Sequence, residues 1–358
     1  MSTFPAPGLS RLPHWLQWSL LAGAGGLAGY ILHHLKIPAG LFLGPMIVAV
    51  AMGVAGSTIR VPRLAFRSGQ GIVMLMVAKS VTLGVLLALS QDWHLMLLVT
   101  ALTILLSAAV GLGMVQFGRI PATTAAWGTA PGAASAMIAM AEESGADDRA
   151  VTCMQYIRVV CVVMIGAWIS HLIVAPEAMH QISIENANGF SLIGLALTLA
   201  VAFVGALSAN FLPAGALLTP IIVGSALNLL GWLDITLTSS ILAVAYGAIG
   251  SYIGLRFDRD TVFKVVRLIP TIITANLVLI LLCTTLAWPL SWLFAKDFLS
   301  VFLATSPGGL DAMAIIAVET GSDASFVVAL QTLRLIGVVL TGKLCANGLI
   351  LLSRRLRT

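Results

Sequence analysis

Apolar runs about 20 residues long recur along the whole chain, and only short polar stretches separate them. A helix needs about 20 apolar residues to cross a bilayer, so this pattern predicts membrane-spanning helices. A transmembrane β-barrel would instead show alternating segments of about 10 residues, and the sequence has none. We expect five full spans in each half of the chain: 14–35, 38–56, 64–79, 93–117 and 148–174, then 190–211, 213–231, 237–255, 268–294 and 325–351.

Two further patterns accompany the spans of each half. A short amphipathic helix is expected after the third span, near 81–90 and 256–267. Between the fourth and fifth spans lies a segment with a Pro-Gly step, 121–145 and 298–321. Non-helical backbone persists at membrane depth only where protein buries it or where it lines a wet cavity. The Pro-Gly steps therefore predict the tip of a re-entrant or broken helix in each half.

The two halves are copies of one another. Residues 129–163 align with 305–339 without a gap, and 14 of the 35 positions are identical. A second block, 37–48, matches 212–223 at nearly the same offset, with seven of 12 positions identical. A fixed offset of this kind is the mark of an internal repeat. We expect a first membrane repeat over 1–175, a linker over 176–189 and a second membrane repeat over 190–358.

The residues shared by the copies fall on one helix face. The first repeat spaces them by 4, 4, 3 and 4 residues, which makes one stripe along an α-helix: Asp147, Val151, Gln155, Arg158 and Val162. The second repeat forms the same stripe with Asp323, Val327, Gln331, Arg334 and Val338. The copies thus share one face of one helix, together with the Pro-Gly break before it.

The basic residues indicate an orientation. If the Pro-Gly segment turns back, each repeat crosses five times and the repeats are inverted; if it crosses, they are parallel. Cytoplasmic loops are enriched in Lys and Arg. With five crossings and a cytoplasmic N-terminus, most loop cations lie inside, namely Arg60, Arg63, Arg67, Arg119, Arg256, Arg259, Lys264, Arg267, Arg354, Arg355 and Arg357. This favours an all-α polytopic protein of the bacterial inner membrane, built of two inverted repeats, with both termini cytoplasmic.

The Pro-Gly steps and the polar residues on the shared face form the candidate site. A helix that starts at such a break points the positive end of its dipole inward. A charged residue at the bilayer centre costs about 2.5–3.5 kcal/mol on insertion scales, so it is usually paired or functional. We expect these residues to bind a solute: Pro131, Gly132, Ser135, Gln155, Arg158, Pro307, Gly308, Gly309, Asp311, Gln331 and Arg334.

Structural explanations compete with this interpretation. A Pro-Gly step is also typical of a plain kink with tight glycine packing. The two glutamines fit interhelical hydrogen bonds as well as ligand contacts. The two arginines have nearby carboxylates as candidate partners, namely Glu143, Asp147, Glu319 and Asp323. Because Asp147 and Asp323 follow a glycine and open their helices, an N-cap is the simplest explanation for both.

Composition narrows the function classes. Charged residues make up 9% of the 358 positions, whereas soluble domains carry about 25%. No polar segment is long enough for a nucleic-acid-binding module, although the net charge is +5. The six histidines lack the spacing of metal ligands, and the four cysteines form no CxxC pair. We therefore expect no metal, no cofactor and no enzymatic activity.

Three motifs point to a known family, namely PAGLFLGPM, APGAASAM…GADDRA…QYIR and SPGGLDAM…GSDASF…QTLR. At these motifs the chain resembles the AbrB family of bacterial membrane proteins, and the resemblance covers residues 15–350. The first copy departs from the Pro-Gly-Gly form, with Ala133 in place of Gly309 and Ser135 in place of Asp311, so the half-sites should differ in chemistry. The family is named for an effect on gene expression, and many members carry the label ammonia monooxygenase.

Three hypotheses for the function follow. The leading one is a secondary transporter of a small organic anion, because paired broken helices in inverted repeats are typical of transport sites. The family's name implies a second, a membrane protein that regulates gene expression directly or through an exported metabolite. The label implies a third, a monooxygenase, which the scattered histidines argue against. The expected partners are the lipid bilayer, the solute and a second copy in a homodimer, with no nucleic acid.

Overall fold

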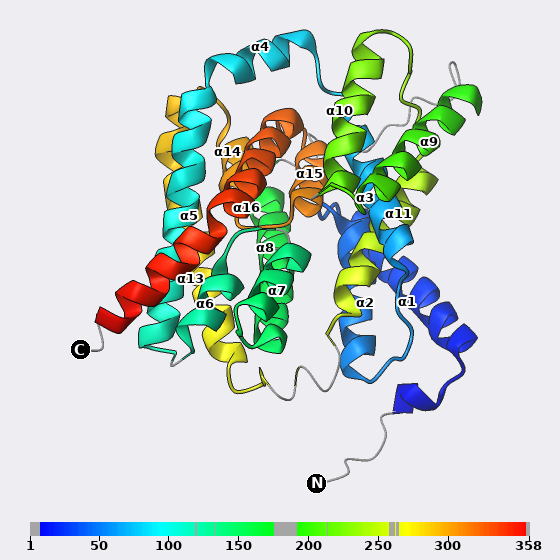
Figure 1. Ribbon diagram of the computed structural model, residues 1–358. Coiled ribbons are helices and arrows are strands. Elements are labelled where there is room, and N and C mark those ends of the chain that lie inside the picture. Colours follow the sequence, from blue (N-terminus) through cyan, green and yellow to red (C-terminus); the bar gives the residue numbers. More distant parts are fainter. Residues whose placement is uncertain are drawn as a thin grey trace. The chain divides into compact units, whose positions relative to one another are not determined.

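The computed structural model describes residues 8–355, apart from 119, 133, 175–191, 213, 258–261 and 263–264. In this part of the chain every regular element is a helix, and no strand is present (Figure 1). The all-helical prediction is therefore confirmed. The predicted linker, 176–189, lies outside the described residues.

The helices of the first half follow the predicted spans to within a few residues. The short helix expected near 81–90 is present as α4, and the Pro-Gly segment is divided into α6 and α7. The elements are η1 (Gly8–Arg11), α1 (His14–His34), α2 (Gly40–Val54), α3 (Arg63–Ala78), α4 (Leu83–Gln91), α5 (Trp93–Gln116), α6 (Ala122–Thr129), α7 (Ala134–Glu143) and α8 (Asp148–Ile173).

The second half repeats this order. The short helix expected near 256–267 falls largely on residues outside the described part. The described helices are α9 (Leu192–Ser208), α10 (Gly215–Leu229), α11 (Ser239–Gly254), α13 (Ile269–Leu293), α14 (Phe298–Thr305), α15 (Leu310–Glu319) and α16 (Ala324–Arg355).

Within the described residues, four helices are long and apolar enough to cross a membrane, namely α5, α8, α13 and α16. The apolar helices α2, α9, α10 and α11 are shorter, with 10–17 residues each. The 15 residues of α2 extend about 22 Å, less than the hydrocarbon core of about 30 Å. α2 starts later than expected because Ala39 has a left-handed φ of 57°, and Ala214 before α10 has the same φ. Ten membrane spans therefore stay a prediction.

The chain forms two compact units, and each unit draws helices from both repeats. The first consists of Met1–Val85, Ala167–Asp260 and Ala314–Ser325. In it α1 packs on α2, and α9 packs on α10. The third helix of each repeat packs on the other repeat, because α11 contacts α2 while α3 contacts α9 and α10.

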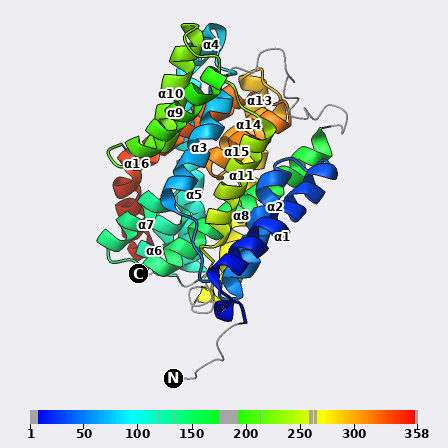
Figure 2. The same ribbon diagram turned by 90° about the vertical axis from the view of Figure 1, so that its right-hand side faces the viewer.

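The second unit consists of Leu86–Gly166, Thr261–Met313 and Phe326–Thr358. α5 packs on α6 and on α13, and α13 packs on α14. Figures 1 and 2 both show α6 and α7 near the lower end of this unit and α14 near its upper end. All the candidate site residues predicted from the sequence lie in this unit.

Candidate functional site

Each Pro-Gly step directly follows the end of a short buried helix. α6 ends at Thr129, two residues before Pro131, and α14 ends at Thr305, two residues before Pro307. The last four carbonyl groups of a helix have no partner within it and carry the negative end of the helix dipole. Buried carbonyls of this kind need hydrogen-bond donors from elsewhere in the protein.

In the first repeat, α8 supplies these donors. Nε2 of Gln155 donates to the carbonyl oxygens of Trp127 at 2.8 Å and Ala130 at 3.2 Å. Arg158 donates from Nη1 to the Ala130 oxygen at 2.7 Å and from Nη2 to the Gly132 oxygen at 3.4 Å. Its Nη2 also donates to Oε1 of Gln155 at 2.6 Å. One Gln-Arg pair thus binds the backbone on both sides of the proline.

In the second repeat, α16 supplies the donors in the same way. Nε2 of Gln331 donates to the carbonyl oxygens of Leu303 at 2.9 Å and Ser306 at 3.1 Å. Arg334 donates from Nη1 to the Ser306 oxygen at 2.6 Å and from Nη2 to the Gly308 oxygen at 3.1 Å. Its Nη2 also donates to the side-chain oxygen of Gln331.

The two networks are one arrangement built twice. Donors and acceptors correspond at a constant offset of 176 positions, as 334 − 158 shows for the arginines. The acceptors are main-chain atoms, so the arrangement does not depend on which side chains they carry. The corresponding pairs are Trp127 and Leu303, Ala130 and Ser306, Gly132 and Gly308, Gln155 and Gln331, and Arg158 and Arg334.

Both guanidinium groups are deeply buried, with Arg158 3% and Arg334 5% exposed. Within the described residues, each of their hydrogen bonds goes to a main-chain carbonyl or to the neighbouring glutamine, and none goes to a carboxylate. Nε of each arginine has no partner there. The carboxylate ion pairs weighed from the sequence are thus replaced by backbone contacts.

The tips of the two Pro-Gly segments pack against the opposite repeat. A Cβ atom on Gly132 would lie 3.1 Å from Cγ1 of Val338, and one on Gly308 would lie 3.0 Å from Cγ1 of Val162. Both valines belong to the stripe that the sequence singled out, one turn beyond the arginines. Each tip is therefore bound by the Gln-Arg pair of its own repeat. It packs against the valine of the other repeat and against a methionine of its own, Met137 or Met313.

The half-sites differ just after the break. Asp311 is buried in the first turn of α15, and its Oδ1 accepts the N–H of Ala312 at 3.1 Å. A Cβ atom on Gly309 would lie 2.7 Å from this same Oδ1, so the second glycine leaves room for the carboxylate. Ser135 holds the equivalent position in α7, and its side chain lies outside the described part, as does Ala133.

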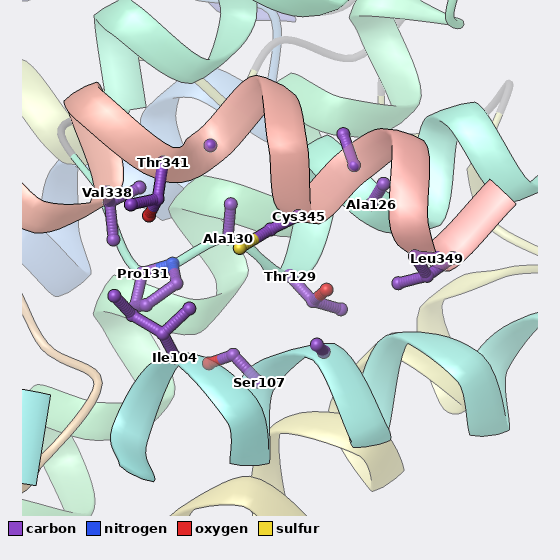
Figure 3. A pocket seen from close by; sticks show the side chains of 13 residues that line it. Ile104, Ser107, Ala126, Thr129, Ala130, Pro131, Val338, Thr341, Cys345 and Leu349 are labelled. Atoms are coloured by element: carbon purple, nitrogen blue, oxygen red, sulfur yellow. The ribbon is translucent and has the colours of Figure 1, made fainter. Parts of the chain in front are cut away.

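A small pocket lies beside the first break. Its cavity volume is about 30 Å³, enough for about two water molecules. Figure 3 shows α16 along one side and α5 along the other, with Ala130 and Pro131 between them. Ser107 lines the pocket, and its Oγ has no partner among the described residues. The broken backbone of the first repeat therefore borders a small cavity that is lined mostly by apolar side chains.

The family described as "Transition state regulatory protein AbrB" matches residues 41–349. A relative from Escherichia coli (strain K12), "Putative regulator AbrB", is 36% identical over 338 residues, which cover 93% of this chain and 96% of that protein. The chain belongs to the AbrB family. A relative from Bacillus subtilis (strain 168), "Uncharacterized protein YhjN", is 29% identical over 350 residues, which cover 90% of both chains. The resemblance seen in the Pro-Gly motifs is thus confirmed over most of the AbrB chain.

Two buried polar residues were not among the site residues predicted from the sequence. Thr100 on α5 and Asn276 on α13 are buried, and their Oγ1 and Nδ2 atoms have no partner among the described residues. They stand 276 − 100 = 176 positions apart, so the repeat offset could have found them. Asp147 behaves as the sequence predicted, because its Oδ1 accepts the N–H groups of Arg149 and Ala150 at 3.1 Å each, as an N-cap does.

Proposed function

We propose that this AbrB-family protein is a secondary transporter of a small organic anion, which binds between the two Pro-Gly tips. The observation that carries the proposal is the pair of buried arginines, Arg158 and Arg334, whose charges no ion pair offsets among the described residues. A buried charge without a counter-ion is costly, so an anionic ligand would stabilise the site. The planar guanidinium suits a carboxylate or phosphate group. The proposal includes no cofactor and no enzymatic step.

Two further features favour an anion at this place. α7 and α15 begin directly after the breaks, so the positive ends of their dipoles lie at the tips. Nε of both arginines and Nε1 of Trp127 are buried donors that lack a partner in the described part of the chain. A ligand with several acceptor oxygens would satisfy donors that are otherwise expensive to bury.

Contacts at the ends of the Pro-Gly segments support re-entrant hairpins. In the first repeat, the N–H of Asp147 after α7 donates to Oγ1 of Thr124 near the start of α6 at 3.2 Å. In the second repeat, the rings of Phe294 before α14 and Phe326 after α15 meet edge to face, with centroids 5.1 Å apart. A segment whose two ends lie side by side enters and leaves a membrane from one face.

Helix lengths support a site near the middle of the membrane. The eight residues of α6 extend about 12 Å, and Arg158 lies about 15 Å from the start of α8. Half of a hydrocarbon core is about 15 Å. α6 and α14 lie toward opposite ends of their unit in Figures 1 and 2, which favours inverted repeats. We therefore propose hairpins that enter from opposite faces of the bacterial inner membrane, with both termini in the cytoplasm.

Flux measurements on the purified full chain in proteoliposomes test this proposal. A panel of labelled probes, for example succinate, citrate and an alkyl sulfonate, would be offered under proton and sodium gradients. At least one probe should exchange across the membrane faster than in protein-free liposomes. A folded Arg158→Ala, Arg334→Ala double variant is the control and should lose the exchange. If no organic anion of the panel exchanges under any gradient, the transport proposal fails.

The names of the matched family and of the relative from Escherichia coli favour a second candidate, a membrane protein that regulates gene expression. Such an effect would be either direct or the result of an exported metabolite. Deletion followed by complementation separates the two routes. If the folded double arginine variant restores the transcript profile as the natural protein does, regulation does not pass through the arginine site. If it fails to do so, transport is the route.

A further inference from the structure

A buried carboxylate lies apart from the arginine networks. Glu319 is the last residue of α15, and its side chain is only 8% exposed. One carboxylate oxygen, Oε2, accepts the main-chain N–H of Ala39. The other, Oε1, has no partner among the described residues. A buried carboxylate oxygen without a donor is costly unless it binds a cation or a proton.

The backbone at Ala39 presents its N–H to this carboxylate. Ala39 is the N-cap residue of α2, and its left-handed φ of 57° sets the helix start one residue later. The positive end of the α2 dipole therefore lies beside Glu319 and favours the ionised carboxylate. Burial acts in the opposite direction, because it favours the neutral acid. The two effects compete at Glu319, so a modest change in its surroundings can change its protonation.

The titratable groups around Glu319 do not neutralise it. Tyr246 on α11 is fully buried and close enough to interact with Glu319 electrostatically, and its phenol donates to Sδ of Met76 at 3.1 Å. Lys36 precedes Ala39 by three residues and is exposed. Nδ1 of His171 lies 3.1 Å from the Lys36 carbonyl oxygen. Asp323 opens the stretch before α16. Beside these groups, Oε1 of Glu319 still has no hydrogen-bond partner among the described residues.

The other repeat shows that the fold does not require this carboxylate. The residue equivalent to Glu319 is Glu143, 319 − 143 = 176 positions earlier, and its side chain is exposed. Ala214, which begins α10 as Ala39 begins α2, still adopts a φ of 57°. The left-handed turn therefore forms without a buried glutamate against it. Support of this turn does not explain why Glu319 is buried.

We propose that Glu319 is a proton-binding site that couples movement of the solute to a proton gradient, an inference that rests on the proposed transport function. A hydronium ion transfers its proton to Oε1: one O–H bond of hydronium breaks, one forms on Oε1, and the products are water and the neutral acid. Oε2 keeps the N–H of Ala39, but the attraction to the α2 dipole is lost. α15 runs back from Glu319 for 10 residues to the Pro-Gly-Gly tip. Protonation therefore weakens the interaction between Glu319 and the N-terminus of α2. That interaction anchors α15, the helix that begins at the Pro-Gly-Gly tip of the proposed solute site.

Infrared difference spectroscopy tests the proton site without any solute. In the purified full chain, a carbonyl band of a buried carboxylic acid should appear as the pH is lowered between about 8 and 5. Glu319→Gln should abolish that band while it keeps an acceptor for the Ala39 N–H. Glu143→Gln, the matched exposed copy, should leave the band in place. A band that persists in Glu319→Gln, or one that is missing from the natural protein, overturns the assignment.

Proteoliposomes then test the coupling. With an anion that the natural protein exchanges, Glu319→Gln should lose accumulation driven by a pH gradient by about tenfold or more, while Glu143→Gln accumulates normally. Counterflow, which needs no net proton movement, should stay within about threefold of the natural protein. Undiminished pH-driven accumulation in Glu319→Gln overturns the coupling role. If the natural protein itself shows no counterflow, the transport function fails, and the infrared titration still reports on Glu319 alone.

A sodium titration separates a proton from a metal cation. At fixed pH, sodium chloride should raise the thermal unfolding temperature of the natural protein no more than potassium chloride does. A sodium-specific increase of about 2 °C or more that disappears in Glu319→Gln would assign the site to a metal cation and overturn the proton assignment.

Discussion

Arg158 and Arg334 each bind the carbonyl oxygen that directly precedes the proline of their own repeat, on Ala130 at 2.7 Å and on Ser306 at 2.6 Å. These carbonyls lie where α6 and α14 end, so each guanidinium stabilises the negative end of a helix dipole. The Nη atoms serve the backbone, while Nε stays without a partner among the described residues. Each guanidinium therefore supports the break through its Nη atoms alone.

Replacement of Arg334 by lysine should weaken both stability and anion binding. An ammonium group cannot hold the Ser306 and Gly308 oxygens through two separate nitrogens. We expect the free energy of unfolding to fall by about 1–3 kcal/mol, and anion affinity to fall about tenfold. Thermal unfolding in detergent and equilibrium binding of an exchanged anion measure the two quantities. Arg63→Lys, exposed at the start of α3, is the control. Unchanged affinity with a large loss of stability would leave Arg334 a purely structural role.

Gln331 and Arg334 should act as one unit. The side-chain oxygen of Gln331 accepts a hydrogen bond from Arg334, and both side chains bind the Ser306 carbonyl oxygen. Residues that share a network couple by about 0.5–3 kcal/mol in double-mutant cycles. A cycle of Gln331→Leu with Arg334→Lys, followed by thermal unfolding, should give a coupling in that range. The same cycle of Gln331→Leu with Arg63→Lys should give none, and a coupling near zero in the first cycle would contradict a shared network.

The helices were largely predictable because apolar runs and their breaks are local features. α8 was expected over 148–174 and is observed at Asp148–Ile173. α2 was expected from residue 38 and begins at Gly40 instead. The cause is the left-handed backbone of Ala39, and alanine gives no sequence signal for that conformation.

The candidate site was predictable only in part. Internal duplication singled out Gln155 and Arg158. Their partners are main-chain carbonyls, and these cannot be identified from the residue types in the sequence. The contact between Gly132 and Val338 joins positions 338 − 132 = 206 residues apart, so it depends on the tertiary fold. Glu143 and Glu319 are identical residues at aligned positions of the two repeats, yet only Glu319 is buried. Burial of one copy follows from packing, and the repeat pattern could not distinguish them.

Because each Pro-Gly tip contacts a valine of the other repeat, a substitution in one repeat should be compensated by one in the other. Gly132→Ala should crowd Met137 and Val338, and Gly308→Ala should crowd Met313 and Val162. Each new Cβ would lie 2.9 Å from a methionine Cε and 3.0–3.1 Å from a valine methyl group. Overpacking of this kind costs about 1–3 kcal/mol. Val338→Ala should restore part of the stability lost in Gly132→Ala, and Val162→Ala should restore part of that lost in Gly308→Ala, as measured by thermal unfolding.

The mismatched combinations serve as controls for that rescue. Val162→Ala added to Gly132→Ala should only deepen the loss, because it removes methyl groups elsewhere and leaves the crowding in place. The same holds for Val338→Ala added to Gly308→Ala. Equal rescue by either valine would mean that the tips are not packed against opposite repeats.

If the two Pro-Gly segments re-enter the membrane from opposite faces, as proposed, the ends of α7 and α15 face opposite sides of the membrane. Ala146 and Ser322 follow these helices at equivalent positions, 322 − 146 = 176 residues apart. In a background that lacks the native cysteines, Cys153, Cys161, Cys283 and Cys345, each position would be changed to cysteine. An impermeant maleimide should label Ser322→Cys on intact spheroplasts, and Ala146→Cys only after the membrane is opened. This expectation follows from the enrichment of Lys and Arg in cytoplasmic loops, which favours a cytoplasmic entrance for the first hairpin and a periplasmic one for the second. Labelling of both positions from the same side would show that the segments cross the membrane and that the repeats are parallel.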